Sequence, residues 1–133
     1  MPRNLKDATY IKTFALNNGA GSTQSAVIDL GADGYKPETI EAELIVPALN
    51  ATMAPDTRTV TYIIETSTTS NFAAVDTTIQ TSGAAGAGGA GIAATSKRVR
   101  LPSNCARYIR GKVTMGSTTG DASSITATFQ LLF

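Results

Sequence analysis

The chain has 133 residues, a formal charge of +1, a single cysteine, and neither histidine nor tryptophan. Without histidine, Ser-His-Asp triads, Cys-His dyads and sites built on the commonest metal ligand are excluded, and one cysteine excludes a disulfide framework. The length suits one domain that buries roughly two-thirds of its unfolded surface. We therefore expect a non-catalytic domain without cofactor or metal, in which Cys105 is a free, half-buried thiol.

The N-terminal stretch MPRNLKDATYIKTF contains scattered charges and no apolar core, which is unlike a signal peptide. Elsewhere no apolar run approaches the roughly 20 residues of a membrane span. We expect no membrane partner and synthesis in a cytoplasm. Residues 1–20 are interpreted as an arm or edge strand, and residues 21–133 as a single domain.

The strand candidates follow one another along the whole chain. Three segments alternate apolar and polar residues with period two, which is typical of half-buried strands. Shorter segments rich in Thr and Val lie between them. The expected strands are residues 9–16, 24–30, 40–46, 59–65, 75–80, 97–101, 107–115 and 125–133.

Turn signals such as Asn-Asn-Gly and Pro-Asp separate these candidates, and no stretch of 12 or more residues has a helical period. About eight short strands at this spacing are typical of an all-β sandwich or barrel, and we predict an antiparallel sandwich of two sheets. The expected core is Val27, Leu44, Val46, Val60, Tyr62, Ile64, Val99, Leu101, Ile109, Val113, Ile125, Phe129 and Leu131.

Residues 81–91, TSGAAGAGGAG, are low in complexity and carry little apolar side-chain area. We expect a flexible loop there, of which Gly83–Gly91 is dispensable for the fold. Gly86, Gly88 and Gly91 match G-x-G-x-x-G, but a dinucleotide site needs a helix next, and residues 97–101 have a strand pattern that stops at Pro102. A mobile surface loop is therefore favoured over a nucleotide site.

The charges are unevenly distributed. Residues 1–76 contain nine acids and five bases, whereas residues 77–133 contain one acid and six bases. If the two strands in this second part pair, one basic patch results, made of Arg98, Arg100, Arg110 and Lys112. Three interpretations stay open: a solvated face with acids nearby, a nucleic-acid site, and a contact with an acidic protein surface. The near-neutral total charge and few aromatics disfavour nucleic acid.

Several segments resemble, in the same order, the capsid cement (decoration) proteins of short-tailed bacteriophages. They are residues 25–32 (SAVIDLGA), 61–67 (TYIIETS) with Phe72 after it, 101–102 (LP), 107–110 (RYIR), 118–120 (TTG) and 125–133. The resemblance covers residues 24–133. Residues 81–91 are not part of it, and residues 1–20 match loosely.

The resemblance implies a jelly-roll sandwich on the exterior of a phage capsid, forming a symmetric homo-oligomer, a dimer or trimer, that clamps the major capsid protein. The four basic residues are then candidates for the protein interface. A carbohydrate-binding or adhesin-type module is the alternative, but it needs aromatic platforms. A jelly-roll enzyme and a shell protein of a small spherical virus are less favoured. Asp29, in the motif VIDLG, is interpreted as a turn residue that accepts backbone N–H bonds.

Overall fold

The computed structural model describes the chain apart from residues 1–5, 32–38, 56, 87–88 and 117–119. Each predicted strand segment overlaps an observed strand, but the segment 24–30 overlaps two short strands instead of forming one. No α-helix occurs in the described residues, so the all-β prediction is confirmed. The strands are β1 (Lys6–Ala15), β2 (Gly21–Gln24), β3 (Ile28–Asp29), β4 (Glu41–Val46), β5 (Thr59–Ser67), β6 (Thr77–Ala85), β7 (Thr95–Arg100), β8 (Tyr108–Met115) and β9 (Thr126–Leu132).

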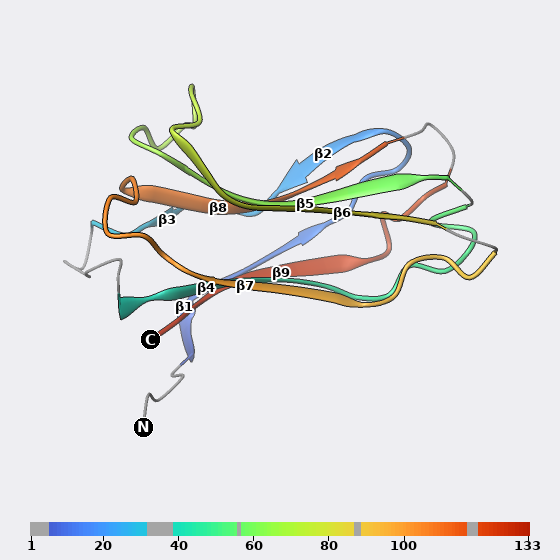
Figure 1. Cartoon of the computed structure of the whole chain (residues 1–133), viewed down its shortest axis with the longest axis horizontal. Helices are drawn as coiled ribbons and strands as arrows, with labels where there is room; N and C mark the ends of the chain where they lie inside the picture. Colours follow the sequence, from blue (N-terminus) through green and yellow to red (C-terminus); the bar gives the residue numbers. More distant parts are fainter. Residues whose placement is uncertain (1–5, 32–38, 56, 87–88, 117–119) are drawn as a thin grey trace.

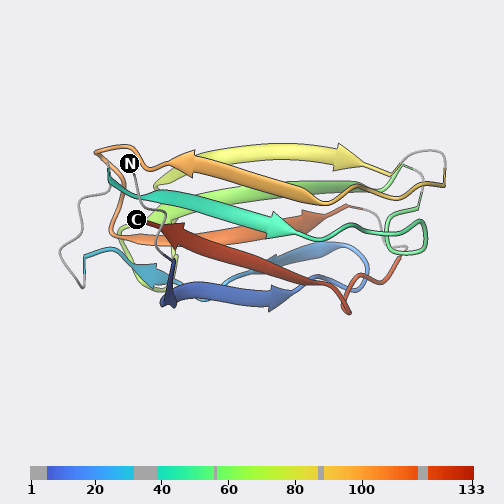
Figure 2. The same cartoon turned by 90° about the horizontal axis from the view of Figure 1, so that it is seen from below.

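The strands form two antiparallel sheets stacked face to face (Figures 1 and 2). The four-stranded sheet has the order β1-β9-β4-β7. The five-stranded sheet has the order β2-β8-β5-β6, with β3 also pairing with β8. β1 and β7 therefore lie at the edges of the four-stranded sheet, and β6 and the pair β2 and β3 lie at the edges of the five-stranded sheet.

The pairing is nested. β5 pairs with β6, β4 with β7, β2 and β3 with β8, and β1 with β9, all antiparallel. The chain thus behaves as one long hairpin that is rolled so that successive pairs lie in alternate sheets. This is the jelly-roll arrangement of a two-sheet sandwich, which agrees with the fold that the sequence resemblance implied.

The core lies between the two sheets and follows the period-two pattern. Ten of the thirteen expected core residues are buried: Leu44, Val46, Val60, Tyr62, Ile64, Leu101, Ile109, Val113, Phe129 and Leu131. Val99 and Ile125 are partly buried against this core. Each fully buried aliphatic or Phe side chain contributes about 1.5–3 kcal/mol relative to exposure.

Gly111 faces this core and leaves room for an aromatic ring. A Cβ added there would lie 3.0 Å from the ring of Phe129. The missing side chain on β8 therefore permits the large side chain on β9.

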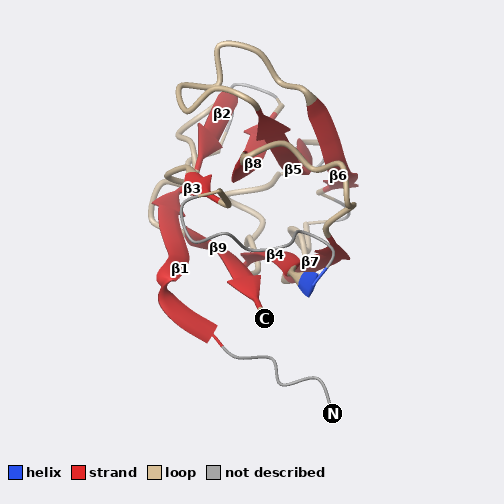
Figure 3. Cartoon of the chain, turned by 90° about the vertical axis from the view of Figure 1, so that its left-hand side faces the viewer, coloured by secondary structure: helices blue, strands red, loops and turns tan. Residues whose placement is uncertain are grey.

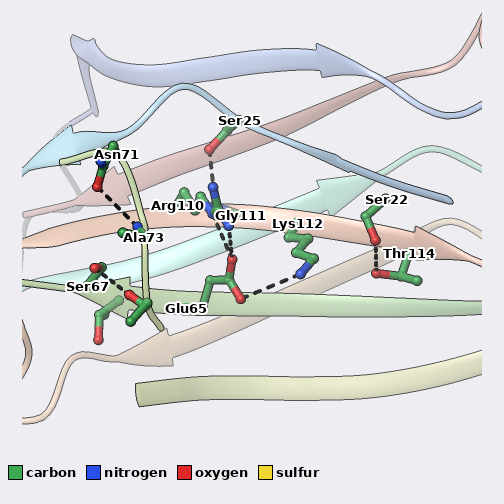
Figure 4. Close-up of polar contacts among 12 residues, drawn as sticks. Ser22, Ser25, Glu65, Ser67, Asn71, Ala73, Arg110, Gly111, Lys112 and Thr114 are labelled. Carbon is green, nitrogen blue, oxygen red and sulfur yellow. Dashed lines mark hydrogen bonds and ion pairs between the residues drawn. The ribbon is translucent and has the colours of Figure 1, made fainter. Parts of the chain in front are cut away.

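Val27 is only half-buried, so its expected core position is wrong, and Ile28 and Leu30 are buried instead. The alternation of buried and exposed residues shifts by one position here, because the chain leaves the hydrogen-bonded ladder between β2 and β3. There the buried Ser25 exchanges backbone and side-chain bonds with β8: its N–H donates to the Gly111 carbonyl at 2.9 Å, and its hydroxyl accepts from the Gly111 N–H at 3.1 Å (Figure 4). This clamp divides one predicted strand into β2 and β3.

The prediction of a loop over residues 81–91 is also wrong for residues 81–85, which form the second half of β6. Gly86 is buried and exchanges backbone hydrogen bonds with residues 57–58, which directly precede β5. Gly91 has φ +70°, and a Cβ added there would clash with the Leu49 carbonyl. Small side chains do not prevent a strand, because ladder hydrogen bonds come from the main chain. As expected, the segment after the glycines is a strand, β7, rather than a helix.

Arg58 ties the loops together at one end of the sandwich. Its side chain is 1% exposed and donates to the carbonyls of Met53 (2.5 Å), Gly120 (2.7 Å), Gly19 (2.6 Å) and Gly116 (3.2 Å). Burial lowers the pKa of this guanidinium, and the charge of Asp121 partly offsets that effect. The residue holds three separate turns, and nothing in the local sequence pattern marked it.

Candidate protein-binding surfaces

The four basic residues proposed as one patch lie in two places. Arg98 and Arg100 are on β7 of the four-stranded sheet, whereas Arg110 and Lys112 are on β8 of the five-stranded sheet. Both pairs point away from the core, so they lie on opposite outer faces of the sandwich. The prediction of a single contiguous patch is therefore wrong, because β7 and β8 belong to different sheets of the jelly roll.

The outer face of the four-stranded sheet carries an exposed polar network. The Arg98 guanidinium contacts the Glu41 carboxylate at 2.5 and 2.6 Å, with the two side chains 39% and 30% exposed. Glu43 accepts bonds from Gln130 Nε2 at 2.5 Å and from Ser96 Oγ at 3.0 Å.

Arg100 is exposed on the same face, next to Arg98. Its backbone lies opposite that of Glu41, whose carboxylate is engaged by Arg98. Arg100 forms no ion pair with another described residue. In this it differs from Arg98, Arg110 and Lys112, each of which lies within 4 Å of a described carboxylate.

The outer face of the five-stranded sheet holds a buried ion pair (Figure 4). Glu65 on β5 lies directly opposite Arg110 on β8. Arg110 Nε and Nη2 lie 2.7 and 2.6 Å from Glu65 Oε1, and Lys112 Nζ lies 3.9 Å from Oε2. The side chains of Glu65, Arg110 and Lys112 are 4%, 15% and 26% exposed, although they project from the outer face. Arg110 and Lys112 are therefore already partnered within the domain.

The connection between β5 and β6, residues 68–76, rises from this face at its end (Figure 1) and helps to bury the pair. Phe72 is 8% exposed, and the Arg110 guanidinium lies 4.0 Å from the centre of its ring. Phe72 has φ +51°, a left-handed conformation that is uncommon for a bulky residue. The Phe72 ring covers the Arg110 guanidinium and shields it from water, and a cation–π contact is strongest when it is desolvated.

Hydrogen bonds within this loop, which we call the Phe72 loop (residues 68–76), hold its shape. Ser67 Oγ donates to the Ala74 carbonyl at 2.6 Å, the Thr68 N–H donates to Asp76 Oδ2 at 2.5 Å, and the Phe72 N–H donates to the Thr69 carbonyl at 3.1 Å. The rest of the loop is exposed. It includes Val75, which at 44% is the exposed large hydrophobic side chain of the described residues. The loop is thus a preformed protrusion that exposes one large apolar side chain.

Asp29 acts as its sequence context predicted, and it has a second role. Its Oδ1 accepts the Gly31 N–H at 2.9 Å, which is the expected turn contact. Arg107 Nε and Nη2 also bind the two oxygens of Asp29, at 2.8 and 2.9 Å. This two-pronged pair joins β3 to the start of β8, and the sequence did not indicate it.

Aromatic side chains are largely withdrawn from the described surface. Tyr10 and Tyr62 are 5% and 2% exposed, Phe129 is fully buried, and Phe133 packs edge-on against Tyr10 with ring centres 5.3 Å apart. Tyr108 is half-buried beside the Arg107 guanidinium. Tyr35 lies outside the described residues. Every described aromatic side chain is thus buried or half-buried, and none is exposed.

The described residues include no group of three His, Cys, Asp or Glu side chains that could hold a metal ion. A hollow of about 440 Å³ at the Arg58 end is lined mainly by small or aliphatic residues, among them Leu49, Met53, Ile92 and Ile125. None of the described residues that line it is charged. Within the described part of the chain, no helix is long and apolar enough to cross a membrane.

Cys105 lies in the connection between β7 and β8 and is a half-buried free thiol, as expected. Burial raises its pKa to about 11. A thiol of this kind is protonated at neutral pH and is a poor nucleophile.

No protein-family model and no curated protein sequence matches this chain. The crystal structure of PBSX exported protein XepA is similar, with a TM-score of 0.53 and 23% identity over 90% of this chain and 34% of the XepA chain. This likeness shows the sandwich fold, and the chain spans about a third of the length of XepA.

Two further solved structures are less similar. The CBM22-1–GH10 modules of Clostridium thermocellum endo-1,4-β-D-xylanase 10B, in complex with xylohexaose, give a TM-score of 0.43 and 10% identity over 99% of this chain and 28% of that one. TmCBM61 in complex with β-1,4-galactotriose gives 0.40 and 11%, over 97% and 86%.

Proposed function

We propose that this chain is a capsid cement (decoration) protein that binds the outer surface of a phage shell and stabilises the junctions between its subunits. The ordered sequence resemblance over residues 24–133 supports this role, and the jelly-roll fold is the one that the resemblance implies. The proposed partners are the major capsid protein and sister copies of this chain, without nucleic acid or membrane. The proposed location is the capsid exterior of the virion.

The Phe72 loop is the observation that carries the proposal. It is a preformed protrusion, held by Ser67, Asp76 and the Phe72–Arg110 contact, and it presents Val75 to a partner. A rigid loop loses little conformational freedom on binding, so more of its contact energy appears as affinity. An apolar side chain on such a loop suits a pocket on a protein surface, where a buried anchor provides much of the binding energy.

The charged residues then have two different roles. Arg110 and Lys112 support the loop through Glu65 rather than contacting the shell themselves. Arg98 and Arg100, on the opposite face, are proposed to contact carboxylates or carbonyls of a neighbouring protein, because the planar guanidinium makes paired hydrogen bonds and stays charged.

Selective binding explains how such a protein would strengthen a shell. Junctions between capsid subunits exist only in the assembled state, so a ligand of the junction stabilises that state by mass action. Many copies bound to one shell add their effects, and linked copies gain from a high effective concentration. Modest affinity at each site is therefore sufficient.

The test is co-sedimentation of the full chain with purified expanded capsids of the phage that encodes it, prepared without this protein. We expect saturable binding and a higher melting temperature of the shell. Val75→Asp should reduce retention at least about tenfold, because a charge would be desolvated in an apolar pocket. Ser124→Asp, at an exposed position in the connection between β8 and β9 and on neither proposed contact surface, is the matched control.

Other outcomes are equally decisive. Loss of retention with Arg98→Gln and Arg100→Gln together, but not with Val75→Asp, would place the shell contact on the four-stranded sheet and contradict the loop assignment. Absence of capsid binding by the unmodified chain would overturn the proposal. Binding of xylohexaose or β-1,4-galactotriose in calorimetric titration would instead support the carbohydrate-binding alternative.

A further inference from the structure

The outer edge of β6 is an uncharged strand edge at the rim of the sandwich. β6 (Thr77–Ala85) ends the five-stranded sheet, and among the described strands it pairs with β5 alone. In Figures 2 and 3 it forms one rim of the molecule, with no described strand beyond it in its own sheet. Its sequence, TTIQTSGAA, contains no charge and no proline.

The hydrogen-bond pattern shows which main-chain groups face outward. The Gly86 N–H donates to the Arg58 carbonyl at 3.0 Å, and these residues continue the register in which Ala84 lies opposite Val60 and Ser82 opposite Tyr62. Antiparallel ladders alternate, so the even-numbered residues from 82 to 86 bond toward β5. The N–H and C=O groups of Thr81, Gly83 and Ala85 therefore point away from the sheet.

The other edges of the two sheets carry features that disfavour pairing. β7 carries Lys97, Arg98 and Arg100, and the sequence of β1 contains Lys6, Asp7 and Lys12 with a register shift after Lys6. β2 and β3 are four and two residues long. Charges, irregularities and short length are the usual protections of an edge. β6 has a register shift near Thr78, but the segment Thr81–Ala85 beyond it has none of these protective features.

We propose that β6 is the self-association edge of this protein, where two copies pair antiparallel about a two-fold axis at Gly83 and join their five-stranded sheets. In this register Gly83 lies opposite Gly83 of the second copy and Thr81 lies opposite Ala85, and each of these pairs exchanges two main-chain hydrogen bonds. A two-fold interface requires a surface that complements itself. An uncharged strand meets this requirement, whereas β7 would place like charges against one another.

The neighbouring side chains leave room for the second strand. Thr81, Gly83 and Ala85 are small and exposed, and a Cβ at Gly83 would lie 3.8 Å from the Val60 carbonyl, an ordinary contact. The interface is narrow, so we expect a reversible dimer rather than an obligate one. The inference does not depend on the capsid role, because it concerns the isolated chain.

Sedimentation equilibrium of the full chain between about 1 µM and 1 mM tests the proposal. We expect a monomer–dimer equilibrium. Gly83→Pro removes an outward N–H without removing a bond to β5, and it should raise the dimer dissociation constant roughly tenfold or more. Gly83→Ala keeps that N–H and is its matched control, with an unchanged constant.

A second pair of variants covers the case in which proline disturbs the fold. Thr81→Lys places a protective charge on the edge and should also raise the dissociation constant roughly tenfold. Thr126→Lys makes the same change at an exposed position on β9, inside the other sheet, and should leave it unchanged. Circular dichroism and urea unfolding check that each variant is folded.

Hydrogen exchange gives a readout specific to this edge. The amides of Thr81, Gly83 and Ala85 should gain protection as the protein concentration rises, while those of Ser82 and Ala84 are protected throughout. A monomer at all concentrations, a trimer, or a dimer unaffected by Thr81→Lys would overturn the inference. Dimerisation without capsid binding would overturn only the proposed function, and capsid binding by a strict monomer would overturn only this inference.

Discussion

The two outer faces of the sandwich each carry an arginine–carboxylate pair across neighbouring strands, and the pairs differ in burial. Arg98 and Glu41 are 39% and 30% exposed, and they meet diagonally, since Glu43 is the residue opposite Arg98. Arg110 and Glu65 are 15% and 4% exposed and lie directly opposite one another. The same chemistry is therefore a surface contact on one face and a structural element on the other.

The cause of the difference is the Phe72 loop rather than the strands. β5 and β8 present Glu65 and Arg110 outward, as β4 and β7 present Glu41 and Arg98. Among the described residues an aromatic ring lies over the first pair alone, 4.0 Å from the guanidinium. Exclusion of water strengthens a charge pair and raises the cost of breaking it. Burial by a loop can thus turn a cross-strand pair on an outer face into part of the core.

The largest effect is expected when the buried pair is broken. Arg110→Gln leaves Glu65 without its main partner in a site shielded from water, which should lower the free energy of unfolding by about 3–5 kcal/mol. Lys112, 3.9 Å away, can compensate only in part. Urea unfolding measures the loss.

The control for this variant is the double change Arg110→Gln with Glu65→Gln, which removes both charges and should be less destabilising than Arg110→Gln alone. A loss below about 1 kcal/mol in the single variant would mean that the pair behaves as a surface pair.

Removal of the aromatic cover should have the next largest effect. Phe72→Ala deletes a ring that is 8% exposed and admits water to Glu65 and Arg110, so we expect a loss of about 3 kcal/mol in urea unfolding. Backbone strain at φ +51° remains in this variant, because alanine also has a Cβ.

Val75→Ala in the same loop is the matched control and should change stability by no more than about 0.5 kcal/mol, because Val75 is exposed. Equal losses for the two variants would show that the loop as a whole, rather than the ring, stabilises this face.

Period-two alternation was sufficient to predict the strands and most of the core. In residues 40–46 and 59–65 every second residue, Ile40 to Val46 and Val60 to Ile64, is buried between the sheets, whereas the outward Ile45 and Ile63 are half-buried. The alternation also identified the outward positions of Arg98 and Arg110 correctly. It could not tell which strands pair, because pairing depends on long-range connections, and so it joined two faces into one patch.

Signals in the sequence were weaker for the features that distinguish the two faces. Glu65 was visible as a polar position in a strand, but its partner depended on the register between β5 and β8. Phe72 lies in a loop of small polar residues without glycine, and nothing local indicated a left-handed backbone there. Residues 81–85 were taken for a loop because their side chains are small, although the main-chain bonds of a strand do not depend on side chains.

The connection that carries the chain from one face to the other provides a chemical probe. Cys105 lies between β7 and β8, and burial raises its pKa to about 11. At pH 8 the thiolate fraction is then on the order of a hundredfold below that of an exposed cysteine, and reaction with a disulfide reagent should be slower by about this factor. The rate should rise about tenfold per pH unit toward the raised pKa, since only the deprotonated form reacts.

The urea-unfolded chain is the internal control for this measurement, because it should react at the rate of a free thiol. A native rate within about tenfold of the unfolded rate would show that this connection opens readily and does not hold the two sheets in place.

The smallest effect is expected at the exposed pair. Arg98→Gln removes an ion pair whose members are more than a quarter exposed, so the free energy of unfolding should fall by less than about 1 kcal/mol. At about 1 M salt the screening length is roughly 3 Å, and the difference from the unmodified chain should disappear. Arg100→Gln, on the same face but without an ion pair to another described residue, is the matched control and should show no change at either salt concentration. The loss in Arg110→Gln should instead persist at high salt, because ions do not enter a site sealed by Phe72. If Arg98→Gln and Arg110→Gln responded to salt alike, the ring would not exclude solvent, and the buried pair would have to be explained by its strands alone.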